Sequence, residues 1–505
     1  MNLSLVNTRA LAGIDAPQIT VEVHLGNGLP SFSIVGLPET SVKESKDRVR
    51  AAILNSHFEF PARRITVNLA PADLPKEGSR FDLAIAIGLL IASEQINVSN
   101  VDDYEFIGEL ALSGKLRPIK GVLPAAIQSR NNQRSLCLPK TNVEEASLVS
   151  DAKLIGANSL LEICGHLSGQ QAIPPHPPTD ADTPQPTDGD VSDVIGQNHA
   201  KRALEIAAAG NHNLLMIGPP GTGKTMIASR LPTILPEMSE DESLETAAIF
   251  SISSQGFSKQ QWKQRPFRAP HHTASAVALV GGGSSPRPGE ISLAHNGVLF
   301  LDELPEYERR VLDVLREPLE SGKIIISRAA RQAEYPANFQ LITAMNPCPC
   351  GYLGDSNGRC RCTHEQVTRY RARVSGPLLD RIDMHIEVPR LSQQQIHQGQ
   401  QTNQISSQEI RQRVSAAREL QIKRCNKANA QLTQPDLRKH CNLTNDDIVL
   451  LEQAVEHLQL STRAYYRILK VARTIADLAG EENILRPHLA EAISYRRLDR
   501  GTKQN

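Results

Sequence analysis

One segment in the middle of the chain, NLLMIGPPGTGKTMIASRL, constrains the fold more than any other. An apolar run is followed by a loop that fits the pattern GxxxxGK[ST] and then by a helical pattern. In this setting backbone N–H groups wrap phosphate groups at the N-terminus of the helix, and a Gly-rich turn without a ligand is the alternative. The loop comprises Gly218, Pro219, Pro220, Gly221, Thr222, Gly223, Lys224 and Thr225.

Four side chains then have expected roles in binding and cleaving ATP. Lys224 would reach the β and γ phosphates, and the Thr225 hydroxyl would ligate Mg²⁺. A second apolar run, GVLFLDE, ends in Asp302 and Glu303, and parallel sheets bind ligands at the carboxyl ends of their strands. We expect Asp302 to hold Mg²⁺ through water and Glu303 to polarise the water that attacks the γ phosphate. A solvated acidic turn is the alternative for the two carboxylates.

Composition and charge set wider limits. Lys plus Arg equals Asp plus Glu at 55 each, so any nucleic-acid contact must come from a local basic surface. No apolar stretch approaches the length of a membrane span, and the first residues lack the pattern of a signal peptide. We therefore expect a cytoplasmic protein with no membrane partner.

The chain divides into four parts of different composition, and the overall fold class expected is α/β. Residues 1–170 mix β-branched runs at 19–24 and 64–69 with the helical stretch FDLAIAIGLLIAS. Residues 171–190 are rich in Pro, Asp and Thr and read as a linker. Residues 191–393 predict a parallel sheet with crossover helices, and residues 394–505 are helical throughout. The strands expected in this sheet are 213–217, 298–301 and 340–344.

From Asp193 onward the order of motifs resembles the AAA+ superfamily of P-loop ATPases. The resemblance implies that Ile195 and Gly196 pack against adenine, and that Asn346 in QLITAMNP is sensor 1, which helps to position the attacking water. It also implies an AAA+ P-loop core followed by a C-terminal helical lid, in which Arg463 of STRAYYRILKVARTIADL is sensor 2.

The resemblance further implies a catalytic group from a neighbouring subunit. Arg381 in SGPLLDRID matches the arginine finger, which stabilises charge on the transferred phosphoryl group. Such a site is completed only in an oligomer, and a hexameric ring is implied. Arg369, Arg371 and Arg373 lie nearby in sequence and leave the assignment open, and a surface ion pair is the alternative for each arginine.

The stretch between Lys224 and Asp302 is longer than in a minimal AAA+ module. It contains RPFRAPHHTASAVALVGGGSSPRPGEISLAHNG, which looks like the helix-2 insert of the Mg-chelatase and MCM branch, and GKIIISRAARQAEYPANF lies at the position of the pre-sensor insert. Such loops project into the ring pore, where positive charge would meet a phosphate backbone, and solvated loop charges are the alternative. The residues concerned are Arg268, His271, His272, Lys323, Arg328 and Arg331.

More narrowly, FRAPHHTAS, AMNPCPCGYLGD and RYRARVSGPLLDRIDMHIEVP resemble the ComM/YifB family of Mg-chelatase-like AAA+ ATPases. The similarity covers nearly the whole chain. It implies a hexameric, ATP-hydrolysing DNA helicase that promotes branch migration of recombination intermediates during natural transformation, with single-stranded or branched DNA as partner. A Mg-chelatase-like ATPase that remodels a protein is the alternative.

Four of the cysteines are close in sequence. Cys348, Cys350, Cys360 and Cys362 form two Cys-x-Cys pairs, so four thiolates could converge on one tetrahedral Zn²⁺. A closed site with four protein ligands would be structural. His364 could replace one ligand, and free thiols are the alternative.

The N-terminal part resembles the Lon protease domain, a Lon-protease-like fold of the ribosomal S5 domain 2 type. Alignment of APADLPKEGSRFDLAIAIGLL and GELALSGKLRPIKGVLPAA places Arg80 at the serine position and Leu123 at the lysine position. The Ser-Lys dyad is therefore missing, and a ring-building or DNA-contacting role is expected. Ser79 and Lys120 lie near enough in sequence to keep an ATP-dependent Lon-like protease as a weak alternative.

Overall fold

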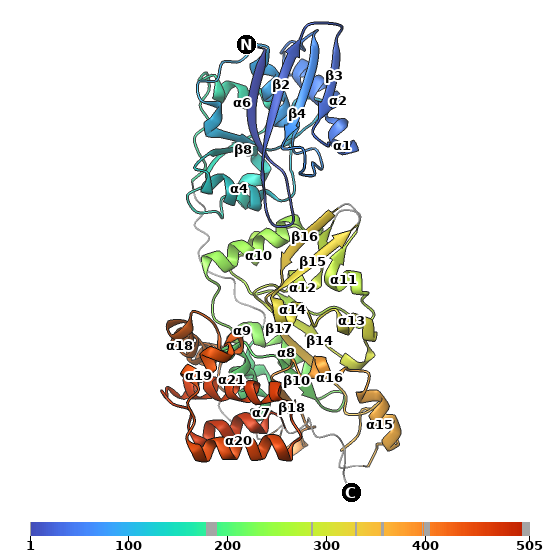
Figure 1. The fold of residues 1–505 in the computed structure, drawn as a ribbon, viewed down its shortest axis with the longest axis vertical. Coiled ribbons are helices and arrows are strands. Elements are labelled where there is room, and N and C mark those ends of the chain that lie inside the picture. Colours follow the sequence, from blue (N-terminus) through green and yellow to red (C-terminus); the bar gives the residue numbers. More distant parts are fainter. Residues whose placement is uncertain are drawn as a thin grey trace. The chain divides into compact units, whose positions relative to one another are not determined.

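The computed structural model describes residues 2–177, 189–283, 286–328, 331–354, 358–395, 397 and 404–496 (Figure 1). The chain forms two compact units. The first unit comprises Met1–Pro184, Glu240–Trp262 and Ser327–Tyr335. The second unit comprises Gln185–Ser239, Lys263–Ile326 and Pro336–Asn505.

A mixed sheet forms the first unit, with the strand order β3-β4-β2-β1-β5-β8-β9 among the described residues. β2 pairs antiparallel with both β1 and β4, whereas β5, β8 and β9 continue from β1 as a parallel run. The expected strands at 19–24 and 64–69 are confirmed as parts of β2 and β4. The bounds are β1 Leu3–Arg9, β2 Gln18–Gly26, β3 Ser31–Val35, β4 Arg64–Ala70, β5 Tyr104–Phe106, β8 Ser135–Pro139 and β9 Lys153–Ala157, and β6 Glu109–Leu110 pairs with β7 Leu116–Arg117 outside this sheet.

The central helix of the first unit is α3 (Asp82–Ala92), which lies on β1 and β2. Its sequence DLAIAIGLLIA is apolar on nearly every side, and all but one of its residues are buried, as expected for a helix enclosed by its domain. The helical stretch expected from FDLAIAIGLLIAS is thus confirmed. The other helices of residues 2–177 are α1 Thr40–Lys43, α2 Ser45–Asn55, α4 Val122–Asn131, α5 Val143–Ala146 and α6 Leu160–Leu167.

Helix α10 (Glu240–Ile252) also belongs to the first unit. Leu244, Ala247 and the following Trp262 share a buried core with Val122 of α4. The sequence-based bounds, which stay a prediction, place residues 240–262 inside the segment 191–393. The apolar residues of α10 indicate that the helix is buried, but they do not indicate which sheet or helix it is buried against.

The second unit contains a five-stranded parallel sheet with the order β11-β14-β17-β10-β18. β10, which leads into the Gly-rich loop, lies between β17 and β18, so the chain leaves β10, β14 and β17 at one edge of the sheet. The three strands expected from the sequence, and with them the α/β fold class, are confirmed. The bounds are β10 Leu214–Ile217, β11 Phe267–Arg268, β14 Val298–Leu301, β17 Gln340–Met345 and β18 Met384–Glu387.

Further helices and two small strand pairs occur along the same part of the sequence. The helices are α7 Asn198–Gly210, α8 Lys224–Ser229, α9 Leu231–Ile234, α11 Ala276–Val280, α12 Glu290–Leu293, α13 Arg309–Asp313, α14 Pro318–Ser321, α15 His364–Arg371 and α16 Gly376–Leu379. Two further strand pairs are β12 Gly281–Gly282 with β13 Arg287–Pro288, and β15 Lys323–Arg328 with β16 Arg331–Pro336.

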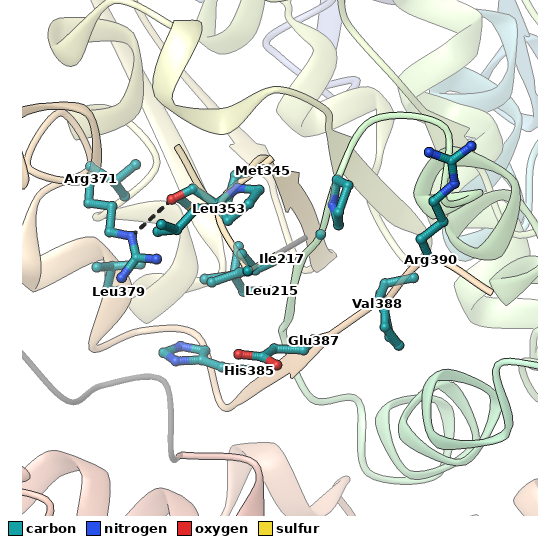
Figure 2. Close-up of a pocket in the computed structure, with 16 residues that line it drawn as sticks. Leu215, Ile217, Met345, Leu353, Arg371, Leu379, His385, Glu387, Val388 and Arg390 are labelled. Carbon is teal, nitrogen blue, oxygen red and sulfur yellow. Dashed lines mark hydrogen bonds between the residues drawn. The ribbon is translucent and has the colours of Figure 1, made fainter. Parts of the chain in front are cut away.

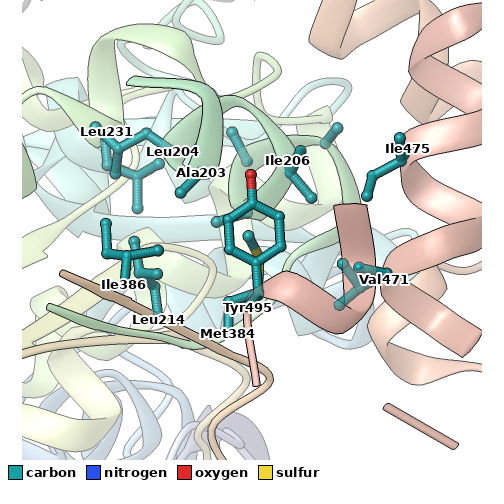
Figure 3. Packing of buried hydrophobic residues seen from close by; sticks show 14 of the residues in the cluster. Ala203, Leu204, Ile206, Leu214, Leu231, Met384, Ile386, Val471, Ile475 and Tyr495 are labelled. Carbon is teal, nitrogen blue, oxygen red and sulfur yellow. The ribbon is translucent and has the colours of Figure 1, made fainter. Parts of the chain in front are cut away.

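The C-terminal helices complete the core of the second unit. Val471 and Ile475 of α21 are buried in one apolar cluster with α7 and the strands β10 and β18, and Figure 3 shows these side chains gathered around Tyr495. The helical character expected for the end of the chain is confirmed. The helices are α18 Ser407–Cys425, α19 Gln434–His440, α20 Asn445–His457, α21 Thr462–Ala479 and α22 Arg486–Ser494. No helix in the described part of the chain is both long enough and apolar enough to cross a membrane.

Candidate nucleotide-binding site

The Gly-rich loop joins the end of β10 to the start of α8. A Cβ atom on Gly218 would collide with the carbonyl oxygen of Val388, so no other residue fits this close approach. Gly221 and Gly223 have φ angles of 76° and 83°, in the left-handed region that favours glycine. The loop therefore has the backbone that a phosphate-binding loop requires, and it ends at the N-terminus of a helix.

Lys224 lies at the centre of the site. Its Nζ donates to the carbonyl oxygens of Gly218 at 2.7 Å and Pro219 at 2.9 Å, and to Asn346 Oδ1 at 3.3 Å. Burial lowers the pKa of Lys224, and the nearby carboxylates of Asp302 and Glu303 oppose that shift. The structure thus brings the loop lysine to the residue expected to be sensor 1.

The two expected Mg²⁺ ligands also meet. The Thr225 hydroxyl donates to Asp302 Oδ2 at 2.6 Å, although the two residues are far apart in sequence. The other oxygen of Asp302 accepts the backbone N–H of Glu303 at 2.8 Å. The Thr225 hydroxyl and the Asp302 carboxylate are oxygen donors of the kind that Mg²⁺ prefers, so these two residues fit the ion. When bound with ATP, Mg²⁺ neutralises charge on the phosphate oxygens.

Glu303 has a contact that sequence analysis missed. Its backbone is left-handed, with a φ of 52°, and its half-exposed carboxylate lies with Oε2 3.1 Å from Nδ1 of His272. The ring of His272 lies 4.1 Å from that of His271 and edge-on to Tyr307, whose hydroxyl donates to Pro270 O at 2.6 Å. His272 therefore orients the residue expected to act as the base.

The strand order explains why this contact could not be read from the sequence. β11 precedes the His271–His272 pair, and β14 precedes Glu303. These strands are neighbours and parallel, so the segments after them leave the sheet at the same edge. The sequence predicted β14 and singled out the His271–His272 segment only as part of an insert, so it did not predict that the two segments are adjacent.

The basic surface expected on the two inserts has less net positive charge than the sequence suggested. Arg268 forms a two-point ion pair with Glu290, with N–O distances of 2.7 and 2.8 Å, so its charge is matched within the chain. Lys323 is exposed. The side chains of Arg328 and Arg331 lie outside the described residues.

The arginines matched to the arginine finger and to sensor 2 are placed differently. Arg381 is buried, with 6% of its surface exposed, and its guanidinium pairs with Glu320 at 2.5 Å. Arg463 is exposed in the first turn of α21. Within the described residues no hydrogen bond joins either arginine to Lys224 or Glu303. The finger and sensor 2 assignments stay predictions.

Ile195 and Gly196 are half-buried at the start of the second unit. Gly196 packs against Leu391, and the Gln197 side chain donates to Pro389 O at 2.7 Å. The segment thus lies against the chain that leaves β18. Its contact with adenine stays a prediction.

A pocket of about 440 Å³ borders the Gly-rich loop. Gly218 and Pro219 contribute to its wall, and Figure 2 shows Arg371 and Leu353 on one side, with Val388 and Arg390 on the other. The dashed line in Figure 2 marks the hydrogen bond that Arg371 donates to the Pro347 carbonyl, at 3.2 Å.

The four cysteines converge as their spacing predicted. The four Sγ atoms lie within 4.8 Å of one another, in Cys348, Cys350, Cys360 and Cys362. Three of the Sγ–Sγ distances are 3.4, 3.7 and 3.8 Å. A tetrahedral zinc with Zn–S bonds of about 2.3 Å has edges of roughly 3.8 Å, so the donor set fits Zn²⁺. His364 is not part of this group among the described residues.

The contacts around Arg80 differ from those of a Ser-Lys dyad. The Ser79 hydroxyl donates to the carboxylate of Glu109, and the Lys120 side chain is exposed. Arg80 is buried and donates to the Lys120 carbonyl at 2.5 Å, and burial lowers its pKa to about 10. The serine thus has an acid as its partner in place of the amine that a dyad needs.

Comparison with known proteins agrees with this geometry. Residues 190–396 match the family model described as "Magnesium chelatase, subunit ChlI", residues 21–142 match "Subunit ChlI of Mg-chelatase", and residues 404–496 match "Magnesium chelatase, subunit ChlI C-terminal". The chain is 54% identical to "Competence protein ComM" of Haemophilus influenzae over 99% of its own length and 98% of that protein. The identity and coverage are the same for "Uncharacterized protein YifB" of Escherichia coli.

The chain belongs to the ComM/YifB family of Mg-chelatase-like proteins. It is accordingly an AAA+ ATPase, for which ATP and Mg²⁺ are the cofactors implied. More distant similarity reaches the "Magnesium-chelatase 38 kDa subunit" of Rhodobacter capsulatus, at 26% identity over 31% of the chain and 49% of that protein.

Proposed function

We propose that the chain is the subunit of a hexameric, ATP-driven motor that acts on DNA and promotes branch migration of recombination intermediates. The observation that carries the ATPase part is the meeting of four motif residues from three strand ends. Lys224 contacts Asn346, and Thr225 contacts Asp302. The DNA part rests on the resemblance to the ComM/YifB family and on the full-length relative named a competence protein.

The chemistry proposed follows from the placement of these residues. Lys224 and the loop backbone bind the phosphate groups, Thr225 and Asp302 hold Mg²⁺, and Glu303 takes up the proton of the attacking water. Asn346 positions that water. Arg381 of the adjacent subunit would complete the site, which requires its guanidinium to leave Glu320 when the ring forms.

A direct test is ATP hydrolysis and strand exchange on a four-way DNA junction. We expect the purified protein with Mg²⁺ and ATP to convert the junction into two duplexes, and we expect forked or single-stranded DNA to stimulate its ATPase in a salt-dependent way. An active ATPase that neither DNA stimulates, and that leaves the junction intact, would contradict the DNA-motor proposal.

The second candidate is an ATPase that remodels a protein, favoured by the similarity to magnesium-chelatase subunits. In that case a protein substrate, and not DNA, would stimulate turnover. An ATP-dependent protease is not favoured, because the Ser79 hydroxyl is bonded to Glu109. The cofactor set proposed is ATP, Mg²⁺ and a structural Zn²⁺ at the four cysteines.

A further inference from the structure

The cysteine group lies directly beside the residues that bind and sense nucleotide. Cys348 follows Asn346 by two residues, at the end of β17, and the turn after Cys348 is closed by a hydrogen bond from the Gly351 N–H to the Cys348 carbonyl at 2.9 Å. Because only Pro347 separates the two residues, an interaction that holds Cys348 in place also restricts the position of Asn346. The amide oxygen of Asn346 accepts the hydrogen bond of Lys224.

The same turn is packed against the Gly-rich loop. Gly351 has a φ of 82°, and a Cβ atom added there would lie 2.7 Å from Cδ of Pro220 and 3.8 Å from Cγ of Asn346. Real Cβ atoms do not approach a neighbour as closely as the first distance. The turn from Cys348 to Gly351 is thus in close contact with the Gly-rich loop, and a larger residue at position 351 would not fit between them.

The other end of the cysteine segment starts α15. Cys362 is followed by Thr363, whose hydroxyl caps the helix by accepting the N–H of Gln366. Two side chains of α15 also contact the residues that directly follow β17. Tyr370 is hydrogen-bonded to the backbone of Asn346, and Arg371 donates to the Pro347 carbonyl at 3.2 Å. The described residues 346–354 and 358–371 are therefore linked at both ends, through the four cysteines and through the contacts of α15 with the end of β17.

We propose that a thiophilic divalent metal of the Zn²⁺ class, bound by Cys348, Cys350, Cys360 and Cys362, fixes the Gly-rich loop and Asn346 in the geometry that binds MgATP. The metal would be structural, since four protein ligands leave no open position. Its binding replaces four thiol protons with four metal–sulfur bonds and releases the protons to solvent. The proposal rests on the proposed ATPase function, because nucleotide binding is the property that the metal controls.

The physical reason is the cost of ordering the loop without a metal. In the described part of the segment between Cys350 and Cys360, residues 351–354 and 358–359, no apolar side chain is fully buried to offset the entropy of closing the loop, and thiols form only weak hydrogen bonds. Metal–thiolate bonds supply folding energy directly. Without them, Tyr370 and Arg371 of α15 would still contact residues 346 and 347, but the turn at Gly351 would lose the four metal–sulfur bonds, and its contact with Pro220 would loosen.

The first experiment measures zinc content and MgATP affinity on the same full-length samples. We expect about one zinc per chain in the parent and none in Cys350→Ser/Cys360→Ser, with MgATP dissociation constants about tenfold weaker in the variant. Cys425→Ser is the matched control, because Cys425 is a partly buried thiol outside the group, and it should keep both metal and affinity. Far-UV circular dichroism checks that each variant is folded.

Removal and return of the metal gives a test without mutation. Treatment of the parent with a zinc-selective chelator should release zinc and weaken MgATP binding, and added Zn²⁺ should restore both. Zinc that is released with no change in MgATP affinity would overturn the inference, as would a parent protein that contains no metal and binds MgATP like the variant.

A second pair of variants separates metal binding from contact with the loop. Gly351→Ala keeps all four cysteines, so it should retain zinc while MgATP binding weakens by about tenfold through the clash with Pro220. Gly354→Ala is matched to it, since Gly354 has a φ of 83° and nothing within 4 Å of an added Cβ atom. Equal MgATP affinities for the two variants would overturn the proposed contact.

These measurements distinguish failure of the inference from failure of the ATPase function. If the parent binds MgATP and hydrolyses it but neither property depends on zinc, the inference alone fails. If the parent neither binds nor hydrolyses nucleotide although it contains zinc, the proposed function fails and the inference fails with it.

Discussion

Glu303 and His272 show what a single pair of side chains can contribute to this site. The carboxylate of Glu303 contacts a histidine that follows a different strand, and the backbone of Glu303 is left-handed directly after β14. A residue expected to accept a proton needs a fixed orientation as much as a suitable charge.

Glu303→Gln should separate nucleotide binding from hydrolysis. The amide keeps the size of the side chain but cannot take a proton, so kcat should fall by about 100-fold or more while MgATP affinity stays within about twofold of the parent. Steady-state ATPase rates and a fluorescent-nucleotide titration measure the two quantities. The control is Glu306→Gln, because Glu306 is a nearby exposed acidic residue that forms an ion pair with Arg373. A Glu303→Gln protein that hydrolyses ATP at the parental rate would show that another group is the base.

The sequence was sufficient for most single residues of the site and insufficient for their contacts. Lys224, Thr225 and Asp302 could be predicted because their motifs have fixed spacing and follow recognisable strands. The pairing of His272 with Glu303 and the burial of Arg381 against Glu320 could not, because both depend on which strands and helices are neighbours.

At the scale of elements, the attachment of α21 to the sheet has a polar centre. The Thr474 hydroxyl lies 2.7 Å from Nε2 of His212 and accepts a hydrogen bond from the Asn429 side chain at 3.1 Å, and all three residues are buried. An apolar replacement would leave two buried polar groups without this partner.

Thr474→Val should therefore destabilise the second unit by about 1–3 kcal/mol. Thr462→Val is the matched control, because Thr462 is exposed at the start of the same helix and both residues are β-branched. Urea unfolding followed by circular dichroism measures the difference. Similar midpoints for the two variants would show that the buried contact contributes little.

His212 also predicts a dependence of stability on pH. Burial lowers its pKa to about 4, although Asp383 opposes the shift, whereas an unfolded histidine titrates near 6.5. Because the unfolded state then binds the proton more strongly, His212 causes a loss of stability as pH falls from about 6.5 to about 4, reaching roughly 3 kcal/mol. His212→Gln should lose less stability than the parent over this range. Parallel curves for the two proteins, measured by urea unfolding at a series of pH values, would contradict the assignment.

Elements were also predicted unevenly from the sequence. Strands β10, β14 and β17 could be predicted because short, mostly apolar runs lead directly into recognisable motifs, and helix α3 because its apolar run is long. The membership of α10 in the first unit could not be predicted, because the apolar pattern of the helix indicates that it is buried but not which unit it is buried in.

On the scale of the whole molecule, the chain passes between two units that have separate cores. Trp262, the one tryptophan in the sequence, is buried in the first unit, whereas Lys224 and Asp302 belong to the second. A ligand that binds only the folded second unit should stabilise that unit by mass action.

We accordingly predict two unfolding transitions on heating. Tryptophan fluorescence should follow the first unit, and MgATP should raise the midpoint of the transition that fluorescence does not follow. Differential scanning calorimetry alongside fluorescence measures both. A single transition that MgATP shifts equally in both signals would show that the units unfold together.

The central claim is that the loop between β10 and α8, with Asp302 and Glu303, forms a site that hydrolyses ATP. The most direct measurement is phosphate release by the purified protein with Mg²⁺ and ATP, with and without forked DNA, beside Lys224→Ala. We predict turnover by the parent and, because the lysine that contacts both the loop carbonyls and Asn346 is gone, loss of at least about 100-fold in the variant. Equal phosphate release by the two proteins, or none by the parent under either condition, would contradict the account.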